Sequence, residues 1–335
     1  MSQPLDIATK LPPEADRVVV SLNPMAGASS ASPRAERLAE LLAEAGIRAE
    51  ILTDLDEVGR LAGAWHAEGR LRALVGVGGD GTAAELVNRT APGLPVTLLP
   101  AGNENLLARY VGIRKAPEQL CRTIAEGRLL RLDAARAGRR LFLVNASCGF
   151  DAEVVRLVHA RRAEGGRTGH VRSRDYVKPF FRVLRSYRYP EIRVSWEGGE
   201  GGGDLVAGEA VVRWLFALNL PCYGGGFRIA PQADGRDGRI DWCTFARGST
   251  WQTLRYAGAV LLRRHRKLAH CHTGRARRLQ IASQAEVPYQ LDGDPGGLLP
   301  VEVEVLPERL TLVVPAPDWV SRDAMYDGLP RPSRD

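Results

Sequence analysis

The most constraining feature of the sequence is a glycine-rich turn between an apolar strand and a helix. Residues 71–77 (LRALVGV) form a largely apolar run, Gly78-Gly79-Asp80-Gly81-Thr82 follows it, and residues 83–89 have helical spacing. A short apolar run that ends in glycine is typical of a buried strand in a parallel sheet. Open α/β sheets bind their ligands at the carboxyl ends of such strands. The turn therefore predicts both a fold class and a binding site.

Strands and helices alternate around this turn through the first third of the chain. We expect strands at residues 17–22, 48–53, 71–77 and 96–99 and helices at residues 32–45, 58–68, 83–89 and from about 103. Strands that alternate with helices form a parallel sheet with helices on its faces. The pattern predicts an α/β N-terminal domain with three layers.

After about residue 133 the pattern changes to short strands with few helices. The expected strands are residues 141–146, 192–196, 209–219, 239–245, 278–282 and 310–314. Gly-rich or Asp-Gly turns separate them, as in an antiparallel sandwich or barrel. Because 335 residues exceed one ordinary core, two domains are expected. We place an α/β domain at residues 1–135, a mainly antiparallel β-sandwich at 136–320 and a tail at 321–335, whose return to the first domain is left open.

Composition limits the classes of partner that the protein can bind and the cellular environment in which we expect it. The net charge of +7 suits an anionic partner, but aromatic residues are only 6% of the chain, which disfavours recognition of nucleic acid by base stacking. Five scattered cysteines without a C-x-x-C pair indicate reduced thiols in a cytoplasmic protein. No uninterrupted apolar run approaches the length of a bilayer span, so we expect any membrane association to be peripheral.

The chemistry of the turn indicates a nucleotide site. Its glycines let backbone N–H groups approach phosphate oxygens, and the helix that begins near Thr82 adds its N-terminal dipole. Asp80 would repel a phosphate, so its useful role is through Mg²⁺ or a hydrogen bond to the nucleotide. The alternative is a tight strand-to-helix turn in which the aspartate is only a cap.

The turn resembles the loop shared by diacylglycerol, sphingosine and ceramide kinases, NAD kinases and phosphofructokinases. A second stretch, Leu99-Pro100-Ala101-Gly102-Asn103-Glu104-Asn105-Leu106-Leu107-Ala108-Arg109, resembles the Leu-Pro-x-Gly-Thr-x-Asn-Asp-x-Ala-Arg signature of the diacylglycerol kinase catalytic domain. It departs at Asn103, where the family has Thr, and at Leu106, where the family has Asp. The resemblance implies that Gly102, Asn103 and Asn105 contact the nucleotide.

Two further nucleotide positions follow from the resemblance. Asn23, in Asn23-Pro24-Met25-Ala26-Gly27, stands in the family's first loop, which helps to shape the nucleotide site. Thr53 falls where the family places a threonine that contacts the nucleotide. From the residues alone, Asn-Pro marks a turn and a single threonine is a good strand former.

The second half of the chain also resembles this family. The stretch Asn145-Ala146-Ser147-Cys148-Gly149-Phe150-Asp151-Ala152 is similar to its Asn-x-x-x-Gly-x-Asp-Ala motif, and residues 223–241 are similar to its Gly-rich run with an Asp-Gly turn. In bacterial lipid kinases that run carries a structural Mg²⁺. The resemblance implies Asp234, Asp237 and the carbonyl of Arg239 as its ligands, because oxygen ligands suit a hard cation. The alternative is that the Asp-Gly pairs only form hairpin turns.

The last motif is Leu291-Asp292-Gly293-Asp294-Pro295. By itself it is an Asp-Gly turn. The family has Asp-Gly-Glu at this place, with the first aspartate as its proposed general base. The resemblance therefore implies that Asp292 is the catalytic base, whereas Asp294 replaces the glutamate with a side chain that is one methylene shorter.

A basic segment at residues 154–189 interrupts the strands. Its arginines and lysines alternate with apolar side chains at helical spacing, among them Tyr176, Phe180, Phe181, Leu184 and Tyr187. One interpretation is an amphipathic helix that docks on an anionic bilayer. The other is a solvated face whose aromatic side chains pack on the core.

Together the motifs favour a lipid kinase that uses ATP and Mg²⁺. It would transfer the γ-phosphate to a hydroxyl of a diacylglycerol- or sphingoid-type lipid at an anionic membrane surface, in a cleft between the two domains. An NAD kinase is the first alternative: Glu104-Asn105 reverses its Asn-Glu pair, although Asn103-Glu104 matches that pair superficially. A catalytically inactive regulator that binds nucleotide or lipid is the second. Nucleic-acid binding is disfavoured, since no reading motif is recognisable, and a homodimer is left open.

Overall fold

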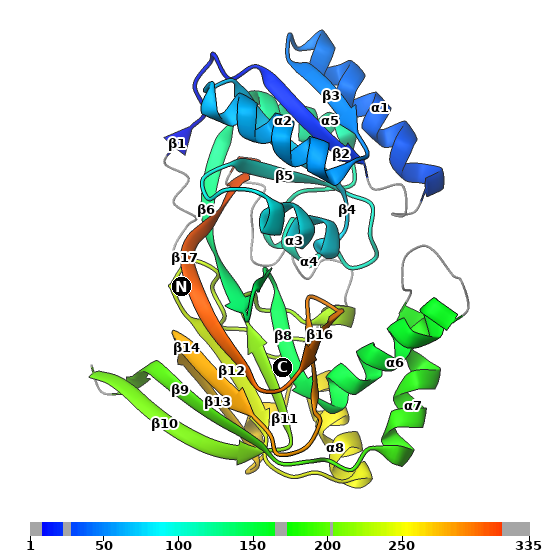
Figure 1. Cartoon of the computed structure of the whole chain (residues 1–335), viewed down its shortest axis with the longest axis vertical. Coiled ribbons are helices and arrows are strands. Elements are labelled where there is room, and N and C mark those ends of the chain that lie inside the picture. Colours follow the sequence, from blue (N-terminus) through cyan, green and yellow to red (C-terminus); the bar gives the residue numbers. More distant parts are fainter. Residues whose placement is uncertain (1–8, 23–27, 165–172, 202–203, 317–335) are drawn as a thin grey trace, which may run out of the picture. The chain divides into compact units, whose positions relative to one another are not determined.

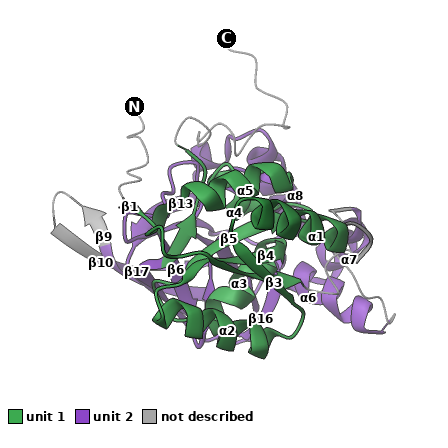
Figure 2. Ribbon diagram, turned by 90° about the horizontal axis from the view of Figure 1, so that it is seen from above, with its two compact units in different colours: residues 1–131, 310–335 green, residues 132–309 purple. Residues whose placement is uncertain are grey.

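The computed structural model describes residues 9–22, 28–164, 173–201 and 204–316 (Figure 1). The chain divides into two units, residues 1–131 with 310–335 and residues 132–309 (Figure 2). The structure thus divides the chain after residues 131 and 309, where the sequence analysis placed the divisions after residues 135 and 320. The expected tail at residues 321–335 lies outside the described residues.

Unit 1 contains a parallel sheet in the order β17-β5-β4-β2-β3. Its strands are β2 (Arg17–Leu22), β3 (Arg48–Leu52), β4 (Leu71–Gly78), β5 (Pro95–Pro100) and the last part of β17 (Val301–Val313). Every residue of the central strand β4 is buried, as the apolar run predicts. A short strand β1 (Thr9–Lys10) pairs antiparallel with β6 (Arg128–Ala137).

Helices cover both faces of this sheet, so the expected three-layer α/β fold is confirmed (Figure 2). The helices are α1 (Ala28–Glu44), α2 (Leu55–Ala67), α3 (Asp80–Arg89), α4 (Leu106–Tyr110) and α5 (Pro117–Glu126). Helix α1 begins earlier than the expected Ser32 and contains Pro33. Pro33 lies beyond the first turn of α1, so its missing N–H removes one intrahelical hydrogen bond. Helix α2 is capped by Asp54, whose carboxylate accepts the N–H groups of Asp56 and Glu57.

Unit 2 is an antiparallel β-sandwich, which confirms the second part of the expected fold. One sheet has the order β10-β9-β14-β17, and the other has the order β13-β12-β11-β8-β15-β16. The side chains of Val194, Leu279 and Val303 from the first sheet share a buried cluster with Leu215 and Ile240 from the second. The strands are β7 (Arg140–Phe142), β8 (Asn145–Gly149), β9 (Ile192–Gly201), β10 (Asp204–Val212), β11 (Trp214–Leu218), β12 (Ile240–Phe245), β13 (Cys271–Ala276), β14 (Arg278–Ala282), β15 (Pro288–Leu291) and β16 (Asp294–Leu298).

The strand expected at residues 209–219 is two strands in different sheets. Between β10 and β11, the guanidinium of Arg213 donates to the carbonyl of Tyr189 at 2.8 Å and to the carboxylate of Glu191 at 2.8 Å. These contacts hold the corner at which the chain passes from one sheet to the other. A local run of apolar residues carries no signal for such a change of sheet.

Three α-helices complete the described part of unit 2: α6 (Phe150–Glu164), α7 (Val177–Ser186) and α8 (Thr250–Leu261). Single-turn helices occupy Ser173–Tyr176, Gly224–Gly226 and His265–Lys267. The ring of Phe150 contacts those of Phe180, Tyr187, Tyr189 and Trp214, which joins α6 and α7 to the sheet. None of the described helices is long and apolar enough to cross a membrane.

Candidate functional site

The glycine turn lies beside the end of the neighbouring strand β5. The N–H of Ala101 donates to the carbonyl of Gly78 at 2.9 Å, and α3 starts with Gly79 as its N-cap. A Cβ on Gly102 would lie 2.7 Å from the Cα of Gly79, and one on Gly78 would lie 2.1 Å from Oγ1 of Thr82. Glycine is therefore required at position 102 because the two backbones touch, and at position 78 because the side chain of Thr82 fills the space. The structure brings the two predicted nucleotide motifs together in unit 1.

Asn105 closes the second of these loops. Its backbone is left-handed, with φ of 50°, and its Nδ2 donates to the carbonyl of Gly102 at 2.7 Å. Its Oδ1 is buried without a hydrogen-bond partner in the described structure. Buried amide oxygens are almost always paired in proteins. This oxygen is therefore an acceptor to which a donor on a ligand, or a water molecule, can bind.

Asp80 holds the start of α4. Its Oδ2 accepts the N–H of Leu106 and its Oδ1 accepts the N–H of Leu107, each at 2.9 Å. Burial raises the pKa of Asp80, and these two backbone hydrogen bonds oppose that effect. The carboxylate is thus a cap for a helix that begins 26 residues away. Its role towards Mg²⁺ or the nucleotide stays a prediction.

Lys115 is a residue at this site that the sequence analysis did not select. Its Nζ donates to the carbonyl of Gly102 at 3.2 Å, and the residue is exposed. A cation here is suited to phosphate. A single lysine after a short helix belongs to no motif, and only the contact with Gly102 identifies it.

For most of the other predicted nucleotide residues, the structure gives a position in unit 1. Gly81 is in the first turn of α3, and Asn103 is exposed in the loop that contains Gly102. Thr53 is exposed directly after β3, and β2 separates that strand from β4. Asn23 lies outside the described residues.

The candidate base in unit 2 is anchored by three backbone groups. Asp292 lies in the turn between β15 and β16 with φ of 50°. Its Oδ2 accepts the N–H of Leu143 at 2.7 Å, and its Oδ1 accepts the N–H groups of Val144 and Asn145, each at 2.9 Å. These donors fix the position of the carboxylate at the start of β8. Since Asp80 belongs to unit 1, a shared cleft stays a prediction.

Two residues that the sequence analysis did not select support this turn. Nε2 of Gln290 donates to Oδ1 of Asn145 at 2.9 Å and to Oγ of Ser147 at 2.8 Å, and its Oε1 accepts the N–H of Gly293 at 2.7 Å. Nε2 of His159 lies 3.1 Å from the carbonyl of Gly293. Both hold the backbone beside Asp292.

Asp294, which replaces the family's glutamate, faces a different pair of groups. Its carboxylate oxygens lie 3.8 Å from Nε2 of His159 and 3.6 Å from Nη2 of Arg140. At these distances, and with Asp294 and Arg140 each 45% exposed, the contacts are weak.

A buried carboxylate joins the two other motifs of unit 2. Oδ2 of Asp151 accepts a hydrogen bond from Oγ of Ser147, and its Oδ1 accepts the hydroxyl of Tyr223 at 2.7 Å. Burial raises the pKa of Asp151, and the hydrogen bond from Ser147 opposes that shift most strongly. The stretch at residues 145–152 and the Gly-rich run at 223–241 therefore meet at this carboxylate.

The predicted metal loop is held by arginine. Nε and Nη2 of Arg236 donate to the two carboxylate oxygens of Asp234, each at 2.8 Å. Oδ1 of Asp237 accepts the N–H of Arg239 at 3.0 Å, and Nη1 of Arg275 lies 3.8 Å from its other oxygen. Burial raises the pKa of Asp237 to about 6.

A resident Mg²⁺ does not fit this arrangement unless Arg236 moves away, because the guanidinium occupies both oxygens of Asp234. Within the described residues, no group of three or more His, Cys, Asp or Glu side chains is placed to hold a metal ion. The ligand set of Asp234, Asp237 and Arg239 stays a prediction that this geometry does not support.

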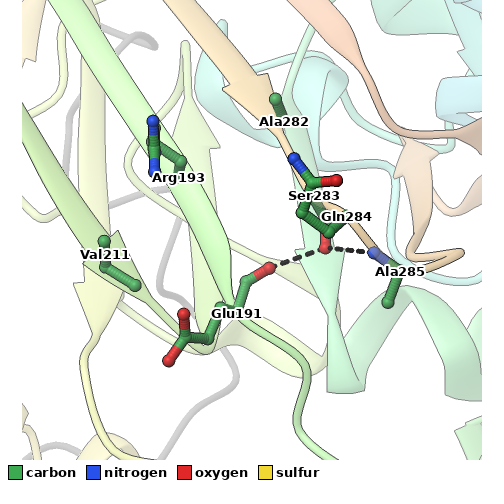
Figure 3. A pocket seen from close by; sticks show the side chains of 7 residues that line it. All are labelled: Glu191, Arg193, Val211, Ala282, Ser283, Gln284 and Ala285. Carbon is green, nitrogen blue, oxygen red and sulfur yellow. Dashed lines mark hydrogen bonds between the residues drawn. The ribbon is translucent and has the colours of Figure 1, made fainter.

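A surface hollow of about 390 Å³ lies elsewhere in unit 2 (Figure 3). Oγ of Ser283 donates to the carbonyl of Glu191 at 2.6 Å and accepts the N–H of Ala285 at 3.2 Å. The hollow is lined by Glu191, Arg193, Val211, Ala282, Ser283, Gln284 and Ala285. It contains none of the predicted site residues, so we do not place the chemistry there.

A parallel α/β unit with a glycine turn at its strand ends, joined to a β-sandwich, is the architecture expected of the kinases that the motifs resemble. Residues 17–137 match the diacylglycerol kinase catalytic domain, and residues 144–314 match the YegS C-terminal NAD kinase beta sandwich-like domain. The chain belongs to this family of lipid kinases. The resemblance and the class of enzyme expected from the motifs are confirmed.

Relatives match over most of their length. The chain is 27% identical to a diacylglycerol kinase of Mycobacterium tuberculosis over 311 residues, which cover 90% of this chain and 96% of that one. It is 26% identical to a diacylglycerol kinase of Bacillus subtilis over 248 residues (72% and 77%). It is 25% identical to a probable lipid kinase YegS-like of Shewanella frigidimarina over 256 residues (73% and 76%).

Solved structures show the same fold. A diacylglycerol kinase from Bacillus anthracis superposes with a TM-score of 0.65 at 18% identity, over 90% of this chain and 97% of that one. An NAD kinase from Archaeoglobus fulgidus in complex with ATP has a TM-score of 0.50 at 12% identity, over 93% and 96%. At such identities the likeness concerns the fold alone.

Proposed function

We propose that the protein transfers the γ-phosphate of ATP, supplied as its Mg²⁺ complex, to a hydroxyl of a diacylglycerol-type lipid. The observation that carries the proposal is the contact between the two glycine loops, in which Gly102 packs directly on Gly79 at the ends of adjacent parallel strands. Gly79 is half-buried and Gly81 is exposed, so this turn presents backbone rather than side chains, and phosphate oxygens bind to backbone N–H groups.

Electrostatics favour a triphosphate at this place. The N-terminus of α3 carries a partial positive charge, and Lys115 adds a full one beside Gly102. Asn105 presents its buried Oδ1 between the loops as an acceptor. The helix N-terminus and Lys115 would position the phosphates and offset their charge, which supplies most of the rate enhancement in phosphoryl transfer, whereas the acceptor on Asn105 suits a hydroxyl or amino donor of the nucleotide.

Asp292 is the proposed general base. It would accept the proton of the lipid hydroxyl as that oxygen attacks the γ-phosphorus and ADP leaves. The three backbone donors support this role because they hold the carboxylate in one position. The names of the relatives favour diacylglycerol as the acceptor over a sphingoid base.

The proposal is tested by incubating the purified protein with labelled ATP, Mg²⁺ and, in separate reactions, diacylglycerol, sphingosine, a total lipid extract or NAD. We expect a phosphorylated lipid, identified by mass spectrometry, and no phosphorylated NAD. Phosphorylation of NAD alone would replace the proposal with an NAD kinase. Binding of ATP without turnover on any of these acceptors would indicate an inactive regulator.

A further inference from the structure

Helix α7 has an exposed face that is both apolar and basic. Val177 and Phe181 are 52% and 53% exposed, and Lys178, Arg182 and Arg185 are exposed beside them. Positions i, i+4 and i+8 share one face of a helix, so these side chains form a continuous strip. The opposite face packs into the aromatic cluster around Phe150. The packed aromatic side chains agree with the second interpretation of this segment, and the exposed strip is the part to which the first interpretation applies.

Helix α8 has a similar exposed face. Trp251 is 71% exposed, Leu254 is 42% exposed, and Leu261 and Leu262 are 68% and 67% exposed, with the exposed Arg255 among them. Single apolar side chains on a surface are ordinary, but a group of this size on neighbouring elements marks an interaction site. A tryptophan with so much exposed area gains from burial in a membrane interface.

A direct contact connects the two helices. Oγ1 of Thr250, the first residue of α8, donates to the carbonyl of Leu184 in α7 at 3.1 Å. The hydroxyl of Thr253, one turn later, donates to the hydroxyl of Tyr189 at 2.7 Å. The start of α8, where Trp251 stands, therefore lies beside the end of α7 (Figure 1). We call the exposed faces of the two helices the α7–α8 surface.

The charge of this surface is of one sign. The sequences of α7 and α8 contain no aspartate or glutamate. Lys178, Arg182, Arg185 and Arg255 form no ion pair within the described residues, although the chain has many exposed pairs elsewhere. Cations that are not neutralised by neighbouring acids attract an anionic surface at long range.

We propose that the α7–α8 surface docks on an anionic lipid bilayer, with Phe181, Trp251 and Leu254 entering the interface and the cations binding lipid headgroups. This inference rests on the proposed function, because it names the surface through which a lipid kinase reaches its substrate. Exposed apolar side chains flanked by cations are the composition of helices that lie in a membrane interface.

Two other occupants fit less well. A second copy that used the same surface would bring like charges together, which opposes a symmetric dimer. Single-stranded nucleic acid would use the cations and the aromatic rings, but the aliphatic side chains Leu254, Leu261 and Leu262 have no role in base stacking.

The test is co-sedimentation with vesicles of phosphatidylcholine, alone or mixed with phosphatidylserine. We expect the protein to bind the mixed vesicles and not the neutral ones. Lys178→Gln with Arg182→Gln and Arg185→Gln should weaken binding by roughly fivefold for each charge removed. Phe181→Ser with Trp251→Ser should weaken it by at least about tenfold.

Matched control variants remove the same chemistry elsewhere. Arg139→Gln, Arg193→Gln and Arg277→Gln remove three exposed cations that likewise form no ion pair within the described residues, and Val211→Ser removes an apolar side chain that is 50% exposed. We expect these variants to bind vesicles like the unaltered protein. A loss as large as that of the α7–α8 variants would show that only total charge or surface apolarity matters, which would overturn the proposal.

Activity separates this inference from the proposed function. With a short-chain diacylglycerol that is monomeric in solution, the α7–α8 variants should keep the rate of the unaltered protein, and with vesicle substrate they should lose it in parallel with binding. If no lipid is phosphorylated while binding still follows the variants, only the proposed function fails. Absence of binding to mixed vesicles, or a dimer that Trp251→Ser dissociates, would overturn the docking surface.

Discussion

A Cβ on Gly102 would lie 2.7 Å from the Cα of Gly79, so any side chain at position 102 would push the two loops apart. We expect Gly102→Ala to lower ATP affinity by about tenfold or more, because the displaced backbone no longer fits phosphate. Gly63→Ala is the control, since a Cβ there meets nothing within 4 Å. Isothermal titration with ATP measures both variants. Unchanged affinity in Gly102→Ala would remove the glycine contact from the nucleotide site.

Asp292→Asn tests the candidate base. An amide keeps one acceptor oxygen and turns its NH₂ towards backbone donors, so we expect a loss of stability of about 1–3 kcal/mol as well as a loss of activity. The rate of the folded variant should fall by about 10² to 10⁴. Rates are compared only at temperatures where circular dichroism shows both proteins folded.

Asp294→Asn serves as a partner variant on the same turn. Because its contacts with Arg140 and His159 are long and partly exposed, we expect a change in stability below about 1 kcal/mol. Rapid lipid phosphorylation by Asp292→Asn together with a large loss in Asp294→Asn would transfer the role of base to the second aspartate.

The contact between Arg236 and Asp234 predicts how the protein responds to removal of divalent metal ions. If its fork to Asp234 holds the loop, chelation of divalent ions should leave the melting temperature of the nucleotide-free protein unchanged. Arg236→Met should cost about 1–3 kcal/mol, because the carboxylate of Asp234 loses the two hydrogen bonds from this guanidinium. Thermal unfolding with and without chelator measures both effects. A lower melting temperature of the unaltered protein in chelator would instead support the Mg²⁺ ligands expected from the sequence.

His265 predicts a dependence of stability on pH. Its side chain is buried, its Nε2 lies 2.9 Å from the carbonyl of Ile229, and burial lowers its pKa from 6.5. Below this value the unfolded chain binds a proton that the folded protein resists, so stability should fall as the pH decreases through about 6.5 and below. His265→Gln should reduce that slope in urea unfolding experiments, whereas the exposed His66→Gln should not. Equal slopes in all three proteins would contradict the assignment.

The sequence predicts local features well. The apolar run of β4, the glycine turn and the change from alternating helices to short strands are signals carried by neighbouring residues. Contacts between residues that are distant in the sequence have no such local signal. The partners of Asp80 lie 26 and 27 residues away, and those of Asp292 lie 147 to 149 residues away. The contacts of Arg213 at the corner between the sheets and of Lys115 with Gly102 belong to no motif either.

Arg236 illustrates a different limit. The spacing of Asp234 and Asp237 suits a cation, but whether the cation is a metal or a side chain depends on the direction in which Arg236 points. That direction is decided by packing in the loop.

Strand β17 has a consequence for dividing the protein. Its residues 310–313 lie in unit 1, where Thr311 and Leu312 pair with β5 and the carbonyl of Val313 accepts the hydroxyl of Thr97 at 3.0 Å. A fragment cut after residue 131 would leave β5 as an open edge with unpaired backbone groups, which invites aggregation. Unit 1 is therefore not encoded by one contiguous gene segment, because its last strand is encoded about 180 codons after residue 131.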